Sequence, residues 1–142
     1  MSKSQKIIIA CGGTGGHLFP GIAVAQELKA RGHEVLLLIS EKKVDAQASQ
    51  KYSDLRFATV RAIAKPPTLS LKMVSFLWRL RKTIKQCGLI ADREEANVIL
   101  GMGGFTSFPP VVAGAKKGLR TYVHDSNAIP GRSNRMTAKR CT

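Results

Sequence analysis

The chain has 142 residues, 44% of them hydrophobic, which suits one globular domain with its own core. Lys and Arg number 23 against 9 Asp and Glu, and the formal net charge of +14 predicts an affinity for polyanions such as nucleic acid, anionic lipid head groups or phosphorylated substrates. The sequence has no apolar run of about 18 residues, so no membrane-spanning helix is expected.

The first half of the chain predicts three strands and two helices. A strand is expected at residues 7–11, followed by a glycine turn at 12–17 and a helix with Pro20 in its first turn and Gly32 at its end. A second strand is expected at 34–39, a short helix within 41–54 and a third strand at 55–63.

The second half continues the same alternation. A helix is expected at 69–84, a strand at 98–100 and a second glycine turn at 101–104. Pro109 and Pro110 open a further helix that stops at Gly118, and a strand at 121–123 precedes a short basic helix at 133–141. This order predicts an α/β, Rossmann-like doubly wound parallel sheet, with residues 1–142 forming one domain.

Three loops, at 12–17, 101–108 and 124–134, each follow a predicted strand. Ligands of such sheets bind at the carboxyl ends of the strands, so the three loops are expected at one edge. Glycine turns between strand and helix expose backbone N–H groups and favour an anionic phosphate. The glycines expected to hold a diphosphate are Gly12, Gly13, Gly103 and Gly104.

Two other interpretations of the glycines stay open. They could serve only as tight turns, without a ligand. They could also belong to a dinucleotide-binding motif, but Leu18 stands where that motif requires glycine, so a nicotinamide cofactor is disfavoured.

His17 is predicted at a helix N-terminus beside the first glycine turn. A neutral imidazole there can accept a proton from a sugar hydroxyl, although a loop or capping role fits the spacing equally well. His33 is expected at the surface, and His124 at the end of the fifth strand can be a packed residue. Cys11, Cys87 and Cys141 lack metal-ligand spacing, and no signal peptide is recognised, so a reducing cytoplasm is expected.

At the level of motifs the chain resembles the MurG family, the UDP-N-acetylglucosamine:lipid I N-acetylglucosaminyltransferases of peptidoglycan synthesis. Residues 12–25 are similar to the family's N-terminal signature, and residues 101–105 to its second glycine loop. Residues 124–127 resemble the family's His-Glu-Gln-Asn, and Asn134 matches a further asparagine. Phe105, Asp125 and Ser126 depart from the family's tyrosine, glutamate and glutamine.

The resemblance implies a GT-B architecture of two Rossmann-like domains, of which this chain would be the first. The C-terminal donor domain would be absent, and the isolated chain inactive. The chain ends within a basic helical stretch, which favours truncation of a longer protein over a natural split subunit.

The resemblance also implies an inverting transfer to the 4-hydroxyl of lipid I, giving lipid II, at the cytoplasmic face of the bacterial inner membrane. His17 would be the general base, with Asp125 as a second catalytic residue. Thr14, Gly15, Gly16 and Asn127 would help to hold the donor, while Phe105 and Asn134 would join the glycine loops around the acceptor diphosphate. UDP-N-acetylglucosamine would be a substrate and no cofactor is expected; carboxylates are sparse and form no Asp-x-Asp pair, so no metal site is expected either.

Residues 69–85 combine an apolar stripe at helical spacing with a basic rim that includes Lys65. The stripe is wider than one buried face needs, which suits contact with an anionic membrane, although a core stripe with a solvated rim is the alternative. Leu69 begins the stripe. The residues expected to contact the membrane are Leu71, Val74, Phe76, Leu77 and Trp78, with Lys72, Arg79, Arg81 and Lys82.

Three rival functions remain at this level. A related GT-B enzyme could act on another lipid or small-molecule acceptor, and a docking module could bind membranes without catalysis. A nucleic-acid-binding domain is disfavoured, because the chain has only eight aromatic residues (five Phe, two Tyr and one Trp), few for stacking on bases.

Overall fold

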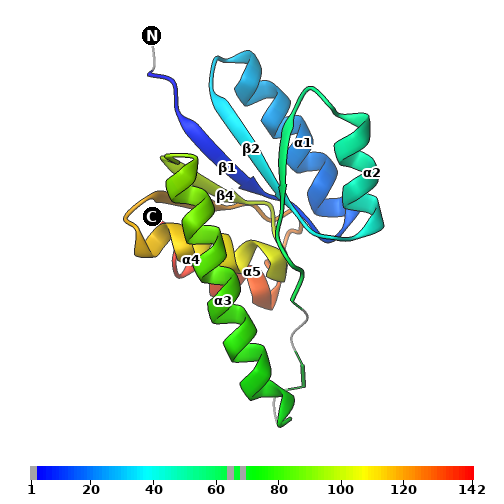
Figure 1. Ribbon diagram of the computed structural model, residues 1–142, viewed down its shortest axis with the longest axis vertical. Coiled ribbons are helices and arrows are strands. Elements are labelled where there is room, and N and C mark those ends of the chain that lie inside the picture. The colour runs from blue at the N-terminus through cyan, green and yellow to red at the C-terminus, as the bar shows by residue number, and fades with distance from the viewer. Residues whose placement is uncertain (1–2, 64–65, 68–69) are drawn as a thin grey trace.

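The computed structural model describes residues 3–63, 66–67 and 70–142. A five-stranded parallel sheet of order β3-β2-β1-β4-β5 forms its centre (Figure 1). The elements in chain order are β1 (Lys6–Ala10), α1 (Gly15–Ala30), β2 (Glu34–Ile39), α2 (Lys43–Lys51), β3 (Arg56–Thr59), α3 (Lys72–Arg93), β4 (Val98–Gly101), the 3-10 turn η1 (Phe105–Ser107), α4 (Phe108–Lys116), β5 (Arg120–Val123) and α5 (Arg132–Ala138). The predicted doubly wound α/β fold is confirmed.

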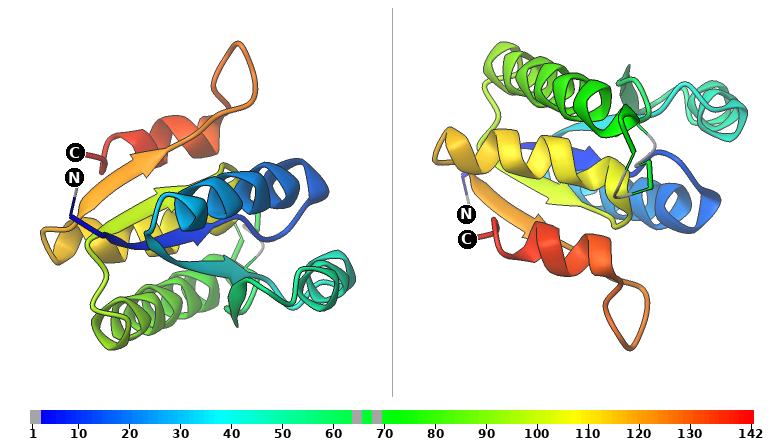
Figure 2. Two further views of the ribbon diagram at one scale, coloured as in Figure 1. Left: turned by 90° about the horizontal axis from the view of Figure 1, so that it is seen from above. Right: turned by 90° about the horizontal axis from the view of Figure 1, so that it is seen from below.

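Helices cover both faces of the sheet (Figure 2). Successive strand side chains point to opposite faces, so the apolar run of β1 contributes to two cores. Ile7 and Ile9 pack in the cluster that includes Leu18 and Ile22 of α1. Ile8 and Ala10 belong to the cluster that includes residues of α3 and α4.

α1 begins earlier than predicted. Its first residue is Gly15, within the glycine turn, so Pro20 is the sixth residue of the helix rather than part of its first turn. Gly32, at φ +84°, follows the helix, and the His33 N–H donates to Leu28 O at 3.0 Å, which closes the helix as predicted.

β3 is shorter than predicted because its partner ends. β2 finishes at Ile39, which pairs with Thr59, and the Val60 N–H makes the last bond of this ladder to Ile39 O at 2.9 Å. Conversely, α3 extends to Arg93, beyond the expected end at residue 84. In its second half Cys87, Ile90 and Ala91 are buried, and Ile90 and Ala91 pack in one cluster with Ile8 of β1.

Candidate functional site

The three loops expected at one edge all follow the carboxyl ends of adjacent strands. β1 pairs with β4, and β4 pairs with β5, all in parallel. The loops that leave these strands therefore lie next to one another, and they contain the first glycine turn, the second glycine turn and residues 124–131. The convergence predicted from the sequence is confirmed.

In the first glycine turn, loop geometry requires two of the glycines. A Cβ on Gly12 would collide with the backbone of Ile39 and Ser40, and Gly13 has φ +106°. The Gly13 N–H donates to the carboxylate of Asp45 at 3.0 Å, so it points into the protein rather than toward a ligand. The Gly13 carbonyl accepts a hydrogen bond from Lys42 Nζ at 2.8 Å.

Asp45 is the residue of this region that the sequence pattern does not reveal. It is fully buried although it lies in the polar segment after β2. Besides Gly13, both the N–H of Ser40, at 2.7 Å, and the Ser40 hydroxyl donate to the same carboxylate oxygen. The only sequence signal is an acidic residue in the first turn of a short helix.

The amino-terminus of α1 carries the catalytic candidate. Thr14 precedes the helix in an extended conformation, and Gly15 and Gly16 are its first two residues. Their N–H groups have no intrahelical acceptor, so they remain suited to an anionic ligand. His17 is partly exposed, and its Nδ1 lies 3.0 Å from the Thr14 hydroxyl.

The second glycine turn forms the seat of the His17 ring. Gly103 and Gly104 have φ values of +112° and +71°. A Cβ on Gly103 would lie 3.1 Å from Nε2 of His17, and one on Gly104 would lie 2.9 Å from Cε1. The Gly103 N–H donates to the Ser107 hydroxyl at 3.1 Å. This turn therefore leaves room for the imidazole of His17. The sequence predicts that its amides face a ligand, but the Gly103 N–H bonds within the loop instead.

Phe105 belongs to an aromatic cluster that joins α3 to α4. Its ring centroid lies 5.7 Å from that of Phe76 and 5.8 Å from that of Phe108. This packing explains the residue by itself, and a contact between Phe105 and a diphosphate stays a prediction.

The third loop is organised by Asp125. Its Oδ1 accepts from the Asn127 N–H at 2.9 Å and from Asn127 Nδ2 at 3.0 Å, while its Oδ2 accepts from Asn134 Nδ2 at 2.7 Å and from the Gly131 N–H at 3.3 Å. These hydrogen bonds, led by the one from the Asn127 backbone, hold the pKa of the Asp125 carboxyl below its ordinary value. The carboxylate therefore stays ionised and is occupied with holding the loop.

Asn134 lies between the third loop and Gly103 of the second glycine turn. It is 6% exposed, and its Nδ2 also donates to His124 O at 3.3 Å. The same Nδ2 would lie 3.3 Å from a Cβ on Gly103, so Asn134 and His17 flank this glycine. Asn127, in contrast, is exposed at the loop surface.

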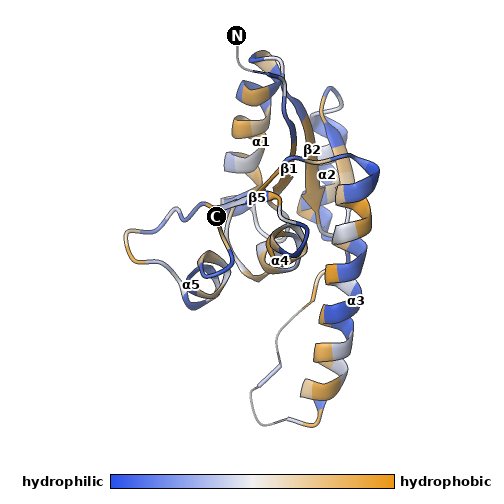
Figure 3. Cartoon of the chain, turned by 90° about the vertical axis from the view of Figure 1, so that its left-hand side faces the viewer, coloured by the Kyte–Doolittle hydropathy of each residue, from blue (hydrophilic) through white to orange (hydrophobic). Residues whose placement is uncertain are grey.

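The expected membrane-contact helix extends beyond the rest of the fold at its amino-terminal end (Figure 1). Leu71, Val74, Leu77 and Trp78 are 96%, 73%, 52% and 65% exposed, and apolar residues gather at this end of α3 (Figure 3). Phe76 is an exception: at 7% exposed it packs on Phe105 and is a core residue, because it points from α3 toward the body. Leu69 and Lys65, also expected at this surface, lie outside the described residues.

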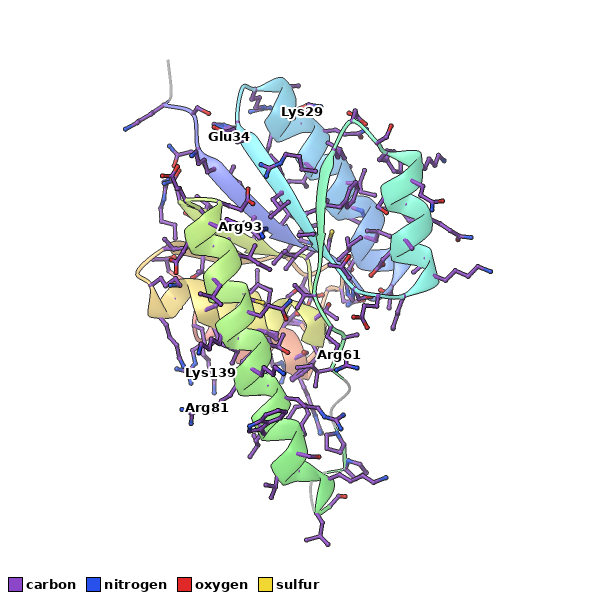
Figure 4. The ribbon with its side chains drawn as sticks, viewed as in Figure 1. Lys29, Glu34, Arg61, Arg81, Arg93 and Lys139 are labelled. Carbon is purple, nitrogen blue, oxygen red and sulfur yellow. The ribbon has the colours of Figure 1, made fainter. Side chains whose placement is uncertain are left out.

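Farther along α3, a groove runs between this helix and α4. Its apolar lining includes Ile84, Leu89, Ala113 and Trp78. Five cationic side chains surround it, namely Arg81, Lys82, Lys85, Lys116 and Lys117. Lys82 Nζ lies 5.3 Å from the centroid of the Trp78 ring, and Arg81 projects from α3 (Figure 4). None of the described helices has the length and apolar character needed to cross a bilayer.

The described residues contain no group of three or more His, Cys, Asp or Glu side chains placed to hold a metal ion. The expectation that the protein has no metal site stays a prediction from the sequence.

Comparison with known proteins gives a consistent family. A model of the glycosyltransferase family 28 N-terminal domain matches residues 7–142. A protein of Shewanella frigidimarina named UDP-N-acetylglucosamine–N-acetylmuramyl-(pentapeptide) pyrophosphoryl-undecaprenol N-acetylglucosamine transferase is 34% identical over 98% of this chain and 38% of its own length. A protein of the same name from Photorhabdus laumondii is 35% identical over 99% of this chain and 39% of its own length. The chain thus spans about two-fifths of the curated relatives it matches.

Solved structures show the same fold. MurG of Acinetobacter baumannii superposes with a TM-score of 0.81 at 20% identity, covering 96% of this chain and 39% of that protein. The glycotransferase of kitacinnamycin superposes with a TM-score of 0.67 at 18% identity, covering 97% of this chain and 34% of that protein.

Proposed function

The chain belongs to the glycosyltransferase family 28 N-terminal domain family, and from this premise we propose that it is the acceptor-binding half of an inverting N-acetylglucosaminyltransferase. The donor is UDP-N-acetylglucosamine, and the acceptor is the 4-hydroxyl of lipid I, whose glycosylation gives lipid II for peptidoglycan. The names of the two curated relatives described above support this substrate pair. A second, donor-binding domain completes the cleft, in keeping with the larger size of those relatives.

The observation that carries the proposal is the position of His17. Its imidazole lies at the amino-terminus of α1, against the glycines of a second loop, at the edge of the sheet where ligands of this fold bind. In the reaction, a ring nitrogen accepts the proton of the acceptor 4-hydroxyl. The hydroxyl oxygen forms the new bond to the anomeric carbon from the face opposite the UDP group. The bond between the anomeric carbon and the UDP phosphate oxygen breaks, and its electron pair leaves with UDP.

The polar groups of the loops that face the cleft bind the anionic substrates. The N–H groups of Gly15 and Gly16, at the positive end of the α1 dipole, oppose the charge of a diphosphate. Thr14 and Asn127, both exposed in loops at this edge of the sheet, contact the donor from this domain. Asp125 acts through Asn127 and Asn134 by shaping the third loop, a role that its four hydrogen bonds support better than proton transfer.

The lipid acceptor requires a membrane surface, which we assign to α3. Leu71, Val74, Leu77 and Trp78 present apolar side chains, and the cationic groove between α3 and α4 adjoins them. Insertion of apolar side chains together with attraction of several cations to an anionic leaflet gives reversible peripheral binding. Lys72 and Arg79 are exposed on the same helix and add to the positive rim.

The test is transfer of labelled N-acetylglucosamine from UDP-N-acetylglucosamine to lipid I by a protein that joins this domain to its donor domain. His17→Ala should lower turnover by about 10²-fold or more, as expected for loss of a general base. His33→Ala is the control, because His33 accepts a hydrogen bond from the Gln5 N–H beside the start of β1, at the other end of the sheet. Turnover within a few-fold of wild type in His17→Ala would refute the base assignment, and transfer only to a small-molecule acceptor would refute the substrate.

A further inference from the structure

The hydroxyl of Thr14 is not used as helix-capping hydroxyls usually are. Threonine before a helix normally accepts a hydrogen bond from a backbone N–H of the first turn. Thr14 has the extended conformation of a capping residue but makes no side-chain cap bond. Its hydroxyl instead lies 3.0 Å from Nδ1 of His17. The Thr14 hydroxyl thus bonds to the imidazole and not to a backbone N–H of the helix.

The other ring nitrogen meets no competing backbone group on the glycine seat. Nε2 lies over Gly103, whose N–H donates to the Ser107 hydroxyl and whose carbonyl accepts from the same hydroxyl at 2.8 Å. Both polar atoms of Gly103 are therefore satisfied within the loop. Among the described residues, the Thr14 hydroxyl is the hydrogen-bond partner of the His17 ring.

These contacts bear on which ring nitrogen carries the proton. If the Thr14 hydroxyl accepts from Nδ1–H, then Nε2 has a free lone pair. If the hydroxyl donates instead, Nε2 carries the proton and has no lone pair to receive another. Only the first arrangement lets Nε2 act as a base.

We propose that Thr14 and Asp45 are positioning residues that hold His17 in the Nδ1–H tautomer, with Nε2 as the proton acceptor. This proposal rests on the assignment of His17 as the base. Thr14 then orients His17 as well as contacting the donor. Asp45 acts on His17 only through the loop, because it makes no contact with the ring.

Asp45 acts by fixing the loop from which Thr14 extends. One of its carboxylate oxygens accepts from the Gly13 N–H, at 3.0 Å, and from the backbone and hydroxyl of Ser40. These bonds tie the residue directly before Thr14 to the end of β2. Within the described part of the chain the second carboxylate oxygen has no hydrogen-bond partner. An amide at this position would bury an N–H₂ group without an acceptor and weaken the tie.

The test is the tautomer of His17, read from the ¹⁵N resonances of its two ring nitrogens in the 142-residue chain at a pH where the ring is neutral. Wild type should show Nδ1 protonated and Nε2 unprotonated. Thr14→Val should lower the ratio of the two tautomers by up to about fivefold, the value for one hydrogen bond of about 1 kcal/mol that is made in the Nδ1–H tautomer and not in the other. Thr14→Ser should restore the ratio, because it restores the hydroxyl.

Asp45→Asn should shift the same ratio in the same direction while the domain stays folded by circular dichroism. Asp54→Asn is the charge-matched control, because Asp54 is an exposed carboxylate near Lys29. His33 is the internal reference: its Nδ1 accepts from the Gln5 N–H, so its own tautomer should not change in any variant. If Asp45→Asn does not fold, Ser40→Ala removes one donor of the same network and is measured instead.

A wild-type ring protonated at Nε2 would overturn the proposal, as would a Thr14→Val ratio equal to that of wild type. Neither result depends on turnover. If the tautomer behaves as proposed and His17→Ala still transfers sugar normally, the positioning is real and the base assignment is wrong, so the two failures can be told apart.

Discussion

Replacing Gly104 by alanine tests whether the second glycine loop is a seat for His17. The new Cβ would lie 2.9 Å from Cε1 of the imidazole, and carbon atoms in contact are normally at least about 3.5 Å apart. The ring must therefore move by about 0.6 Å, which weakens its hydrogen bond to Thr14. Gly104 also has φ +71° and ψ 177°, a conformation open essentially to glycine alone, where an alanine costs on the order of 1–3 kcal/mol.

Gly118 provides a control for the positive φ alone. It has the same φ of +71°, and a Cβ there would meet nothing within 4 Å. Gly118→Ala should therefore lose roughly 1–2 kcal/mol of unfolding free energy. Gly104→Ala should lose more, because its backbone conformation is less accessible to alanine and because a hydrogen bond of about 1 kcal/mol is disturbed.

The two variants should differ most in catalysis. A displacement of about 1 Å near the chemistry can cost about 10²-fold, so a shift of about 0.6 Å should lower turnover roughly tenfold in Gly104→Ala and leave Gly118→Ala unchanged. Urea unfolding followed by circular dichroism measures the stability in the isolated domain, and the lipid I transfer assay measures turnover in the protein with its donor domain. Equal stability and equal turnover in the two variants would show that His17 does not rest on Gly104.

Three further predictions concern charge and thiols. Hydrogen bonds lower the pKa of Asp125, so its contribution to stability is complete above its unfolded-state pKa of about 4 and is lost as the pH falls through the lower folded-state value. The difference in unfolding free energy between wild type and Asp125→Asn should therefore be constant at neutral pH and shrink below about pH 4. Lys82→Gln should weaken binding to vesicles of anionic lipid about fivefold, for about 1 kcal/mol per cation, whereas Lys51→Gln, which removes a similar cation near Tyr52 on α2, should change it little in a co-sedimentation assay. Burial raises the pKa of the Cys11 thiol to about 12, so a thiol reagent at pH 8 should modify the half-buried Cys141 first and Cys11 only on unfolding, as mass spectrometry of partly labelled protein would show.

Each of these has a clear contrary result. A pH-independent difference for Asp125→Asn would mean that the carboxylate does not organise the third loop. Equal losses for Lys82→Gln and Lys51→Gln would mean that vesicle binding follows total charge rather than the α3 surface. Early labelling of Cys11 would mean that the glycine-loop side of the core opens readily.

The sequence alone determined the order of strands and helices, the parallel sheet and the edge at which three loops meet. Each of these depends on local features: apolar runs, glycine after a strand, and proline or glycine at helix ends. The local signals were less informative about boundaries. The glycine pattern predicts a turn over residues 12–17, so the predicted start of α1 is too late: Gly15 and Gly16 belong to the helix. The local signals also ended α3 too early, because burial against neighbouring elements, rather than local pattern, maintains its second half.

Only the tertiary structure decided which side chains meet across elements. Asp45 looks like a surface residue of a polar helix, yet the close approach of β1 and β2 buries its carboxylate under Gly13. Phe76 fits the apolar stripe of α3, yet it is buried and packs on Phe105. The seat of His17 on Gly103 and Gly104 depends on β1 and β4 being neighbours in the sheet. Spacing along a chain specifies a face of one element, whereas contacts between elements follow from strand order and crossover geometry, which become definite only when the chain is folded.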